Sequence, residues 1–445
     1  MAHVFSVTDG TTTITFTAAN GYQVEEYDML APEIQKGVAA PDVAETIVLY
    51  ITGANTAQVQ LRKASLDLLL GKANFRTRWG VGPRVYWQVQ VDGDASTYRA
   101  ELFECRPEDQ EDTLRLWPNK APTVSLSIRR AAEFERTDLV QIPGSNGNGA
   151  NNTSGLTVYS HDDGGAGNDS YIQFAAADVL GSLPTPLILE LTNNTGGAVQ
   201  YDQILLSTNA FSDPANFSHV LQAETILASG GSVVSDGTCS NGAMVQRTFT
   251  GSDAQQYNLT QALLQDAQGF DFHLLARFKV ITADVYVRPT IYDATGVFPL
   301  WTGDEVHLPL LSSALADLGV VPLPPGGYAA NWGAMRLRLT WRGTGTITSE
   351  TDFFAFFPAA TFRRLKVLAT VANGGKVVDD PTAGRAYVSA SGVELPAVAP
   401  QGMPLLVWPN TLQRVYFAWS LLNLSAPITQ TLSVKAWHRP RRYTF

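Results

Sequence analysis

Short runs of β-branched and aromatic residues, separated by tight turns, are the feature that most limits what this chain can fold into. Residues 84–91, for example, alternate in the way typical of a strand with one buried face. The dipeptide Asp9-Gly10 lies between two such runs, at 4–7 and 11–17, and predicts a β hairpin. The 37 glycines and 24 prolines supply further turns throughout the chain. The sequence therefore predicts a mainly β protein.

One segment breaks this pattern and predicts a helix. Between Asn55 and Lys72, apolar residues recur at helical spacing among good helix formers, and Gly71 is expected to end the helix. A second, shorter helix is predicted over 259–267. Residues 1–142 are therefore expected to form a small β-sandwich with one inserted helix.

Composition predicts how the rest of the chain is divided. Residues 143–155 are rich in Gly, Asn and Ser, and are expected to form a linker between domains. The spacing of strands and turns in 156–362 suits a jelly-roll β-sandwich. Residues 363–445 again predict strands, which we expect to pack with residues 156–200.

Charge and local sequence exclude several classes of protein. The formal net charge of -10 argues against a protein that coats nucleic acid, because neutralising phosphates needs clustered Lys and Arg. No stretch approaches the roughly 20 apolar residues that a membrane helix needs. The first residues lack the pattern of a secretory signal, so we expect no secretion. Cys105 and Cys239 are interpreted as free thiols of a reducing compartment.

Two segments of the sequence resemble the distal tail proteins of long-tailed phages. Gly181-Ser-Leu-Pro-Thr-Pro186 resembles the "G-x-x-P-x-P" turn that leads into the second domain of that family. Gly402-Met-Pro-Leu-Leu-Val-Trp-Pro-Asn410 and the ending Trp437-His-Arg-Pro-Arg441 resemble the family's "G-x-P-x-L-x-P-G-x-N" turn and closing "Y-x-P-R-W" strand. The chain departs from the family in having Asn410 where Gly is usual and Arg442 where Trp is usual.

The resemblance implies a structural protein of the virion rather than an enzyme. Residues 1–142 would be a tail-tube-like ring domain whose copies pair edge to edge, in a ring that is hexameric by resemblance. The ring would continue the tail tube and anchor hub or fibre proteins of the tail tip, after assembly in the host cytoplasm. Residues 363–445 would belong to a galectin-like sandwich, and 156–362 look like a carbohydrate-binding module. Neither specific nucleic-acid binding nor membrane insertion is implied.

Aromatic residues in the middle sandwich are candidates for binding a host surface glycan. Flat rings stack on sugars through apolar contact, although such residues are more often part of a core. The candidates are Trp301, Tyr328, Trp332 and Trp341, with Tyr292 nearby. They support an alternative function, a glycan-binding receptor-binding or decoration protein of the virion. A further alternative is the major tail-tube subunit.

The densest set of oxygen ligands lies in residues 161–169. Asp162, Asp163, Asn168 and Asp169 could contribute to a Ca²⁺ site, because Ca²⁺ takes six to eight oxygens from a flexible loop. Clusters of Asp, Asn and Gly are also ordinary turns, so no cofactor is firmly expected.

Motifs of catalysis are absent from the sequence. The six histidines show no metal-ligand spacing, and there is neither a nucleophile elbow nor a phosphate-binding loop. No catalytic residue is predicted, although a glycan hydrolase needs only two carboxylates that meet in space. The basic ending, which includes Arg439, Arg441 and Arg442, is interpreted as a surface strand end or a contact between subunits.

Overall fold

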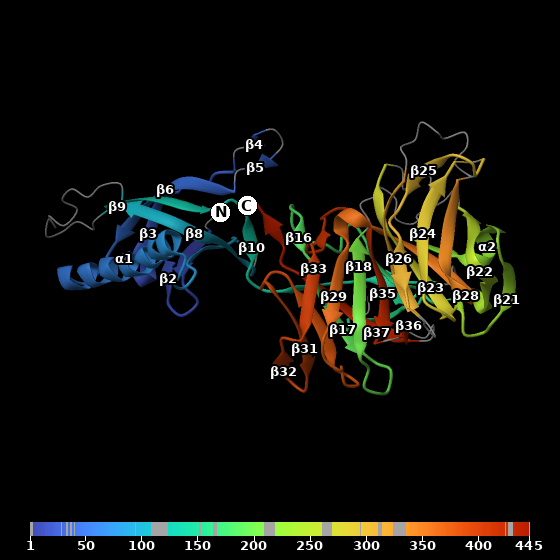
Figure 1. The fold of residues 1–445 in the computed structure, drawn as a ribbon. Coiled ribbons are helices and arrows are strands. Elements are labelled where there is room, and N and C mark those ends of the chain that lie inside the picture. The colour runs from blue at the N-terminus through green and yellow to red at the C-terminus, as the bar shows by residue number, and fades with distance from the viewer. Residues whose placement is uncertain are drawn as a thin grey trace. The chain divides into compact units, whose positions relative to one another are not determined.

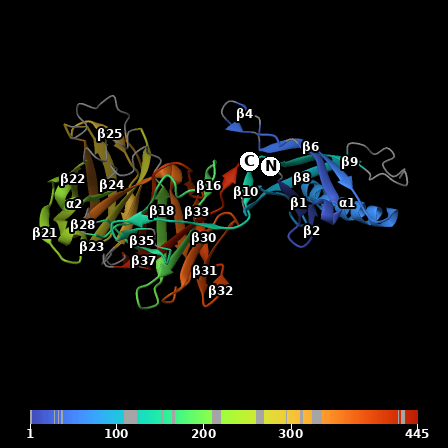
Figure 2. The same cartoon turned by 180° about the vertical axis from the view of Figure 1, so that it is seen from behind.

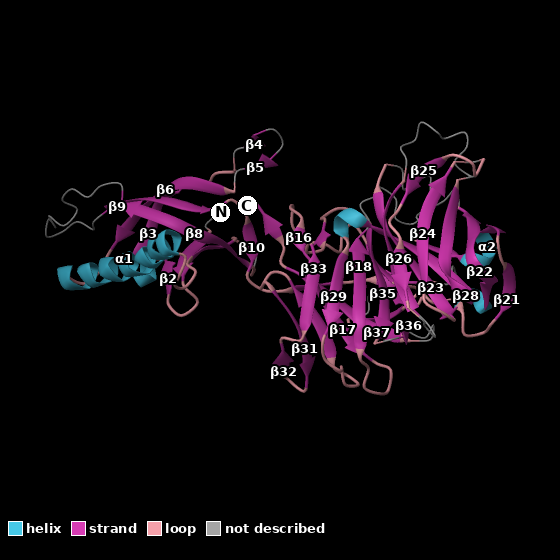
Figure 3. Cartoon of the chain, in the orientation of Figure 1, coloured by secondary structure: helices cyan, strands magenta, loops and turns pink. Residues whose placement is uncertain are grey.

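The computed structural model describes most of the chain: residues 3–27, 29–32, 34–35, 38–39, 41–93, 95–107, 123–150, 153–162, 167–208, 219–259, 269–293, 295–309, 314–323, 335–422, 424–425 and 430–444. It divides into two compact units (Figure 1). The first unit contains 1–140, 180–185 and 439–445, and the second contains 141–179 and 186–438. Strands dominate both units, which confirms the mainly β prediction (Figure 3).

The first unit is built on one antiparallel sheet. Its strands follow the order β2-β1-β7-β8-β9-β6-β3. Their bounds are β1 Val4–Thr8, β2 Thr13–Phe16, β3 Tyr22–Tyr27, β6 Asp42–Ile51, β7 Tyr86–Gln90, β8 Thr97–Pro107 and β9 Thr123–Ala131, with the short strands β4 Ile34–Gln35 and β5 Val38–Ala39 pairing separately. Thr8 pairs with Thr13 and Gly10 has a φ of 85°, so the predicted hairpin at Asp9-Gly10 is confirmed.

Aromatic side chains make this sheet curl around a single core. Trp87 of β7 is buried and its ring centroid lies 5.4 Å from that of Phe16 and 5.7 Å from that of Phe5. The same indole lies 5.6 Å from the ring of Tyr27. Phe16 and Tyr27 belong to β2 and β3, the two end strands of the sheet order, so one indole joins both ends of the sheet.

The predicted helix is present and is longer than expected. Helix α1 spans Thr56–Trp79 and lies along β8 (Figures 1 and 2). Asn55 caps its first turn by accepting a hydrogen bond from the amide of Gln58 at 2.9 Å. Gly71 was expected to end the helix, and that prediction is wrong. The helix ends at Gly80, whose φ of 70° places it in the left-handed region.

Contacts beyond Gly71 explain why the helix continues. Ala73 is buried in the core, and the Asn74 side chain both donates to the Cys105 carbonyl and accepts from the Cys105 amide, each at 2.8 Å. A glycine inside a helix costs only about 1 kcal/mol relative to alanine, which such contacts offset. The second predicted helix, 259–267, lies almost entirely outside the described residues.

The second unit has three sheets, here called the β17, β18 and β28 sheets. The β17 sheet contains β11 Val140–Ile142, β14 Leu156–Tyr159, β17 Ile188–Asn193, β30 Lys376–Asp380, β31 Arg385–Ala390, β32 Val393–Leu395 and β37 Thr431–His438. The β18 sheet contains β12 Ser145–Asn146, β13 Gly149–Ala150, β15 Tyr171–Phe174, β18 Tyr201–Thr208, β29 Arg363–Val367, β33 Val398–Gly402, β35 Gln413–Leu421 and β36 Leu424–Ser425.

The β28 sheet is formed by the intervening part of the chain. It contains β19 Val220–Gln222, β20 Leu227–Ser229, β21 Ser232–Ser235, β22 Ala243–Asn258, β23 Asp271–Ile281, β24 Val285–Tyr292, β25 Pro299–Thr302, β26 Val306–Leu308, β27 Ala314–Pro322 and β28 Arg336–Pro358. Helix α2 is a single turn, Ala223–Ile226. Short strands β16 Thr185–Pro186 and β34 Leu406–Val407 complete the list, together with β10 Phe134–Arg136 and β38 Arg441–Arg442 of the first unit.

The β18 sheet is buried on both faces and so connects two cores. On β35, Phe417 and Trp419 belong to the core shared with the β17 sheet. The intervening residues Tyr416 and Ala418 belong to the core of the β28 sheet. Successive side chains of a strand point to opposite faces of the sheet. In an isolated sandwich one of these faces would be exposed to solvent, but here each face packs in a different core.

The division of the chain differs from the predicted one in two places. Residues 145–150, predicted as linker, form the β12–β13 hairpin, and Ser145 pairs with Gln173. Residues 156–208 and 363–438 share the β17 and β18 sheets, whereas the β28 sheet begins only at Val220. The boundary between sandwiches therefore lies between β18 and β19, because the strands before it pair with the end of the chain rather than with their neighbours in sequence.

A buried ion pair supports the first unit. The guanidinium of Arg130 donates to both carboxylate oxygens of Glu45, and both side chains are fully buried. The Tyr27 hydroxyl donates to Glu45 at 2.6 Å, and the Leu30 amide donates at 2.8 Å. Arg130 also donates to the Ala131 carbonyl and stacks over the ring of Phe134, 4.2 Å from its centroid. Every charge in this network has a partner.

We expect Glu45→Ala to lower the free energy of unfolding of the first unit by about 3–5 kcal/mol, because it leaves the Arg130 cation buried without its counter-charge. Urea denaturation of the full chain, followed by circular dichroism and tryptophan fluorescence, measures the change. Glu25→Ala, at an exposed glutamate of β3, is the control and should shift stability by less than about 0.5 kcal/mol. Equal unfolding midpoints for the two variants would contradict a stabilising role for the pair.

Candidate functional site

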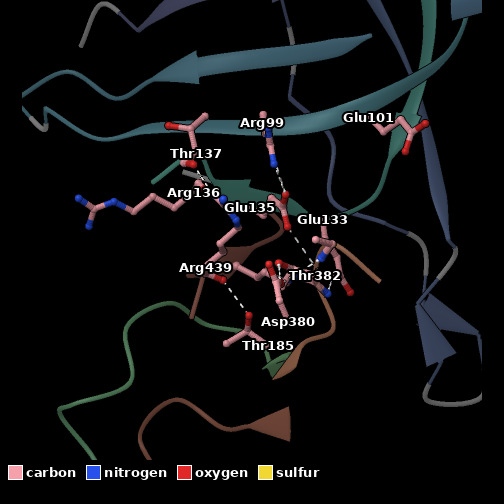
Figure 4. A network of polar contacts seen from close by, with 12 residues as sticks. Arg99, Glu101, Glu133, Glu135, Arg136, Thr137, Thr185, Asp380, Thr382 and Arg439 are labelled. Carbon is pink, nitrogen blue, oxygen red and sulfur yellow. Dashed lines mark hydrogen bonds and ion pairs between the residues drawn. The ribbon is translucent and has the colours of Figure 1, made fainter. Parts of the chain in front are cut away.

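Of the residues that carry the family resemblance, 181–185 and 439–441 meet in the first unit, whereas 402–410 lie in the second unit. The carbonyl of Arg441 accepts hydrogen bonds from the amides of Ser182 at 2.9 Å and Leu183 at 3.2 Å. The hydroxyl of Thr185 donates to the Arg439 carbonyl at 2.8 Å (Figure 4). Gly181 has a φ of 109°, and a β-carbon there would lie 2.8 Å from the Arg441 oxygen. Glycine is therefore required for this contact, which we call the motif junction.

The motif junction also joins the sheet of the first unit. Strand β38 pairs with β10, which in turn pairs with β8 through Glu135 and Arg99. The Arg136 amide donates to the carbonyl of Pro440 at 2.9 Å. The ending of the chain is thus a backbone-paired strand of this unit, which gives β10 a neighbour on each side.

Charged side chains close the motif junction. Arg99 donates to Glu135 at 2.9 Å, as Figure 4 shows, and Arg441 pairs with Glu133 at 3.0 Å. The guanidinium of Arg442 donates to the Tyr98 hydroxyl at 2.7 Å and lies 4.3 Å from the centroid of that ring. The basic ending was predicted to be a surface strand end or a contact between subunits. It forms the end strand β38, which pairs with β10, and its arginines interact within the first unit.

Helix α1 presents a second apolar face to solvent. Val59, Leu66, Leu69, Leu70 and Ala73 are buried in the core. Exposed large apolar side chains lie on the opposite face: Leu61, Leu68, Phe75 and Trp79, with exposed fractions of 68%, 69%, 53% and 60%. They are spaced by seven, seven and four residues, which places them in one row along the helix, here called the α1 stripe. The row is about 27 Å long at the rise of an α-helix.

The predicted aromatic candidates for glycan binding are placed differently from one another. Trp341 has an exposed fraction of 0% and packs between Phe249 and Phe278, while its indole nitrogen donates to Gln255 at 3.0 Å. It is a core residue and offers no surface to a sugar. Trp301 is half-buried on β25, where it pairs with Ile291. Tyr328 and Trp332 lie outside the described residues.

The predicted Ca²⁺ ligands fall in a partly described loop. Asp169 is buried, Asp162 and Asn168 are half-buried, and Asp163 is outside the described residues. The Asp162 carbonyl accepts a hydrogen bond from Gln222 at 2.9 Å, and the Asp169 carbonyl accepts one from the Tyr159 amide at 2.9 Å. No cluster of three His, Cys, Asp or Glu side chains suited to a metal occurs in the described part of the chain. The calcium site stays a prediction.

One serine–histidine pair and both cysteines are buried. The hydroxyl of Ser170 lies 2.7 Å from Nε2 of His219, but both residues are buried. Burial and, to a smaller extent, the nearby Arg414 lower the pKa of His219 to about 3, so the imidazole is neutral. Cys105 and Cys239 are buried free thiols whose pKa is raised to about 12, mainly by burial. A substrate in solution cannot reach any of these groups without opening a core.

Comparison with known proteins gives only distant similarity. No family model and no curated protein matches the chain. The solved Dit protein of phage SPP1, described as a hub adsorption apparatus of phages that infect Gram-positive bacteria, aligns over 99% of this chain and 100% of its own, with 9% identity and a TM-score of 0.39. The baseplate of phage p2 in its activated conformation with calcium aligns over 79% of this chain and 98% of its own, with 10% identity and a TM-score of 0.23.

A third similarity involves a protein of a different kind. The insecticidal crystal protein Cry2Aa aligns over 59% of this chain and 32% of its own, with 9% identity and a TM-score of 0.19. Identities and TM-scores this low do not place the chain in a family. No helix in the described ranges is both long and apolar enough to cross a membrane. The function is therefore argued from the residues themselves.

We expect Trp341→Ala to destabilise the second unit by about 3–5 kcal/mol, because it removes a large side chain from a closed core. Differential scanning calorimetry of the full chain measures the loss as a lower Tm of one transition. Trp301→Ala, at the half-buried indole of the same sheet, is the matched comparison and should have a clearly smaller effect. A larger loss at Trp301 than at Trp341 would contradict the difference in burial.

Proposed function

We propose that this protein is a structural, non-enzymatic component of a phage tail, of the distal tail kind, and that it assembles as a ring. The observation that carries the proposal is the motif junction. The amides of Ser182 and Leu183 donate to the Arg441 carbonyl, and Gly181 allows the close approach, although these stretches that resemble distal tail proteins are far apart in sequence. If the two segments resembled distal tail proteins only by chance, there would be no reason for them to bind each other in the folded chain.

The α1 stripe supports self-assembly. Four large apolar side chains exposed on one side of a helix are unusual for a monomer in solution, so a partner should cover them. Its rim is basic near the end of the helix, where Arg78 stacks over Trp79 at 5.2 Å, while the exposed Arg84 there pairs with Glu101 at 3.5 Å. Elsewhere in the same unit, β3 exposes Glu25 and Glu26. A second copy of this chain therefore offers the charge that complements the rim.

The geometry of these surfaces favours a ring over a two-fold dimer. The stripe lies on a helix, whereas the acidic side chains lie on β3, which pairs only with β6 among the described residues and ends the sheet order. A contact between two different surfaces of one unit is heterologous, and it closes into a ring when the rotation between copies allows. The end strand is also available for pairing with another chain. The number of copies, expected to be six by resemblance, follows from that rotation.

In a tail, such a ring would continue the tail tube on one side and hold hub or fibre proteins on the other. The acidic character of the chain is suited to that place, because a negatively charged lumen does not retain passing DNA. The protein would then be a virion component assembled in the host cytoplasm. Its partners would be the tail-tube protein and the proteins of the tail tip.

The double variant Leu68→Glu/Phe75→Glu tests the ring. Two carboxylates in the centre of the α1 stripe should prevent burial against another copy, since an unpaired buried charge is costly. We expect the wild-type chain to run as a closed oligomer in size-exclusion chromatography with light scattering, to appear as rings in electron micrographs, and the variant to run as a monomer.

Gln60→Glu is the control, because it adds a carboxylate to the same helix at an exposed position about 100° away from Leu61 around the helix axis. It should leave the rings intact. A wild-type protein that stays monomeric at micromolar concentration, or a double variant that still forms rings, would overturn the assembly proposed here. The unchanged circular dichroism spectrum of both variants separates loss of assembly from loss of fold.

A further inference from the structure

Four arginines and two tyrosines lie on one face of the β28 sheet. The register of β24 against β28 pairs Tyr286 with Arg342, Arg288 with Thr340, Thr290 with Arg338 and Tyr292 with Arg336. Residues paired across a sheet share a face, and the intervening residues, such as Val287 and Trp341, belong to the buried core. We call this outward face the arginine face. It extends about 20 Å along β28 from Arg336 to Arg342 at the rise of a strand.

The positive charge of this face is only partly neutralised. Arg342 pairs with Glu305 at 2.7 Å, an ion pair that lowers the pKa of that carboxyl. The charge of Arg288 acts on the same Glu305 carboxyl, whereas Arg336 and Arg338 form no ion pair with another described residue. Arg336 donates to the Gln256 amide oxygen at 3.3 Å, and Arg338 donates to the Tyr292 hydroxyl at 3.4 Å, so both contact neutral groups. In addition, Nε of each of these two guanidinium groups is buried without a hydrogen-bond acceptor.

The tyrosines hold the guanidinium groups in place. Arg342 lies over the ring of Tyr286, 4.5 Å from its centroid, and Arg338 lies over Tyr292 at 5.6 Å. The ring of His307 on β26 also contacts Tyr286, with 5.0 Å between the two ring centroids. Stacked guanidinium groups keep their N–H edges available, and these edges match carboxylate and phosphate oxygens in pairs.

We propose that the arginine face binds a linear anionic glycan, a chain of sugar units that carry phosphate or carboxylate groups. The cations stand in a row along β24 and β28, which fits repeated charges on an extended polymer better than a single ion. This activity goes beyond the proposed structural role and does not depend on it. Of the aromatic residues singled out in the sequence it uses only Tyr292, which is half-buried, and none of Trp301, Tyr328, Trp332 and Trp341.

A single-stranded nucleic acid is the competing anionic polymer. Proteins that bind it without sequence preference combine a basic groove with aromatic faces on which bases stack. On the arginine face, the rings of Tyr286 and Tyr292 are already stacked against arginines and offer little surface to a base. The geometry therefore favours recognition of the charged groups of a glycan over recognition of bases.

The test measures binding of the full chain to four labelled oligomers by fluorescence anisotropy: a phosphomannan hexamer, a hexagalacturonate, a neutral dextran hexamer and a thymidine hexanucleotide. We expect binding of at least one anionic glycan oligomer, weakening as NaCl rises from 50 to 300 mM, and no binding of dextran. Arg288→Ala/Arg338→Ala should weaken that binding about a hundredfold, or about tenfold for each guanidinium removed.

Arg385→Ala is the matched control, because Arg385 is exposed in the same unit but lies on the β17 sheet, paired with Glu394. It should bind the oligomers as the wild type does, and the melting curves of both variants should show an intact fold. Binding of the phosphate oligomer alone, the carboxylate oligomer alone or both supports the proposal and identifies the charged group. Failure of both to bind, binding unchanged in the double variant, or tighter binding of the hexanucleotide would overturn it.

Discussion

The backbone hydrogen bonds at Arg441 are the contacts on which the first unit depends. They bring together the N-terminal sheet, residues 180–185 and the end of the chain, so this unit is complete only when nearly the whole sequence has been made. Without β38, strand β10 would leave one edge open to other chains. Strand pairings between residues far apart in sequence form slowly. Residue 181 must be glycine, because a β-carbon there would collide with the backbone of Arg441. A truncated piece ending near residue 142 would therefore lack part of its own sheet.

Local features of this fold could be predicted from sequence, because they depend on neighbouring residues. The hairpin at Asp9-Gly10 needs only a turn and two flanking runs, and the start of α1 needs only a cap. The end of α1 could not be predicted in the same way. Gly71 and Gly80 are equal as local signals, and the choice between them is made by Asn74, which binds the backbone of Cys105 on a distant strand.

Glycine-rich composition misled the prediction for residues 143–155 for a related reason. Gly144 sits where a β-carbon would lie 2.5 Å from the Ile172 side chain, so this glycine allows close packing rather than free rotation. The burial of the candidate aromatic residues could not be predicted from sequence either. Alternation of residues along a strand does not show which face of the sheet is covered when both faces carry apolar side chains. By contrast, the arginine face could have been predicted from sequence. Arginines at 336, 338 and 342 alternate with large apolar residues, a pattern that places the arginines on one face of a strand.

Net charge says little about where this protein can hold an anion, because many cations are used internally. Arg130, Arg277 and Arg363 are buried against Glu45, Asp352 and Asp379, and the arginines of the C-terminus pair within the first unit. Each of these pairs buries one positive and one negative charge, so the net charge of the chain stays negative. Among the described residues, Arg336 and Arg338 of the arginine face form no ion pair, so this face keeps positive charge. An acidic chain can therefore repel DNA as a whole and still attract a more sparsely charged polymer at one place.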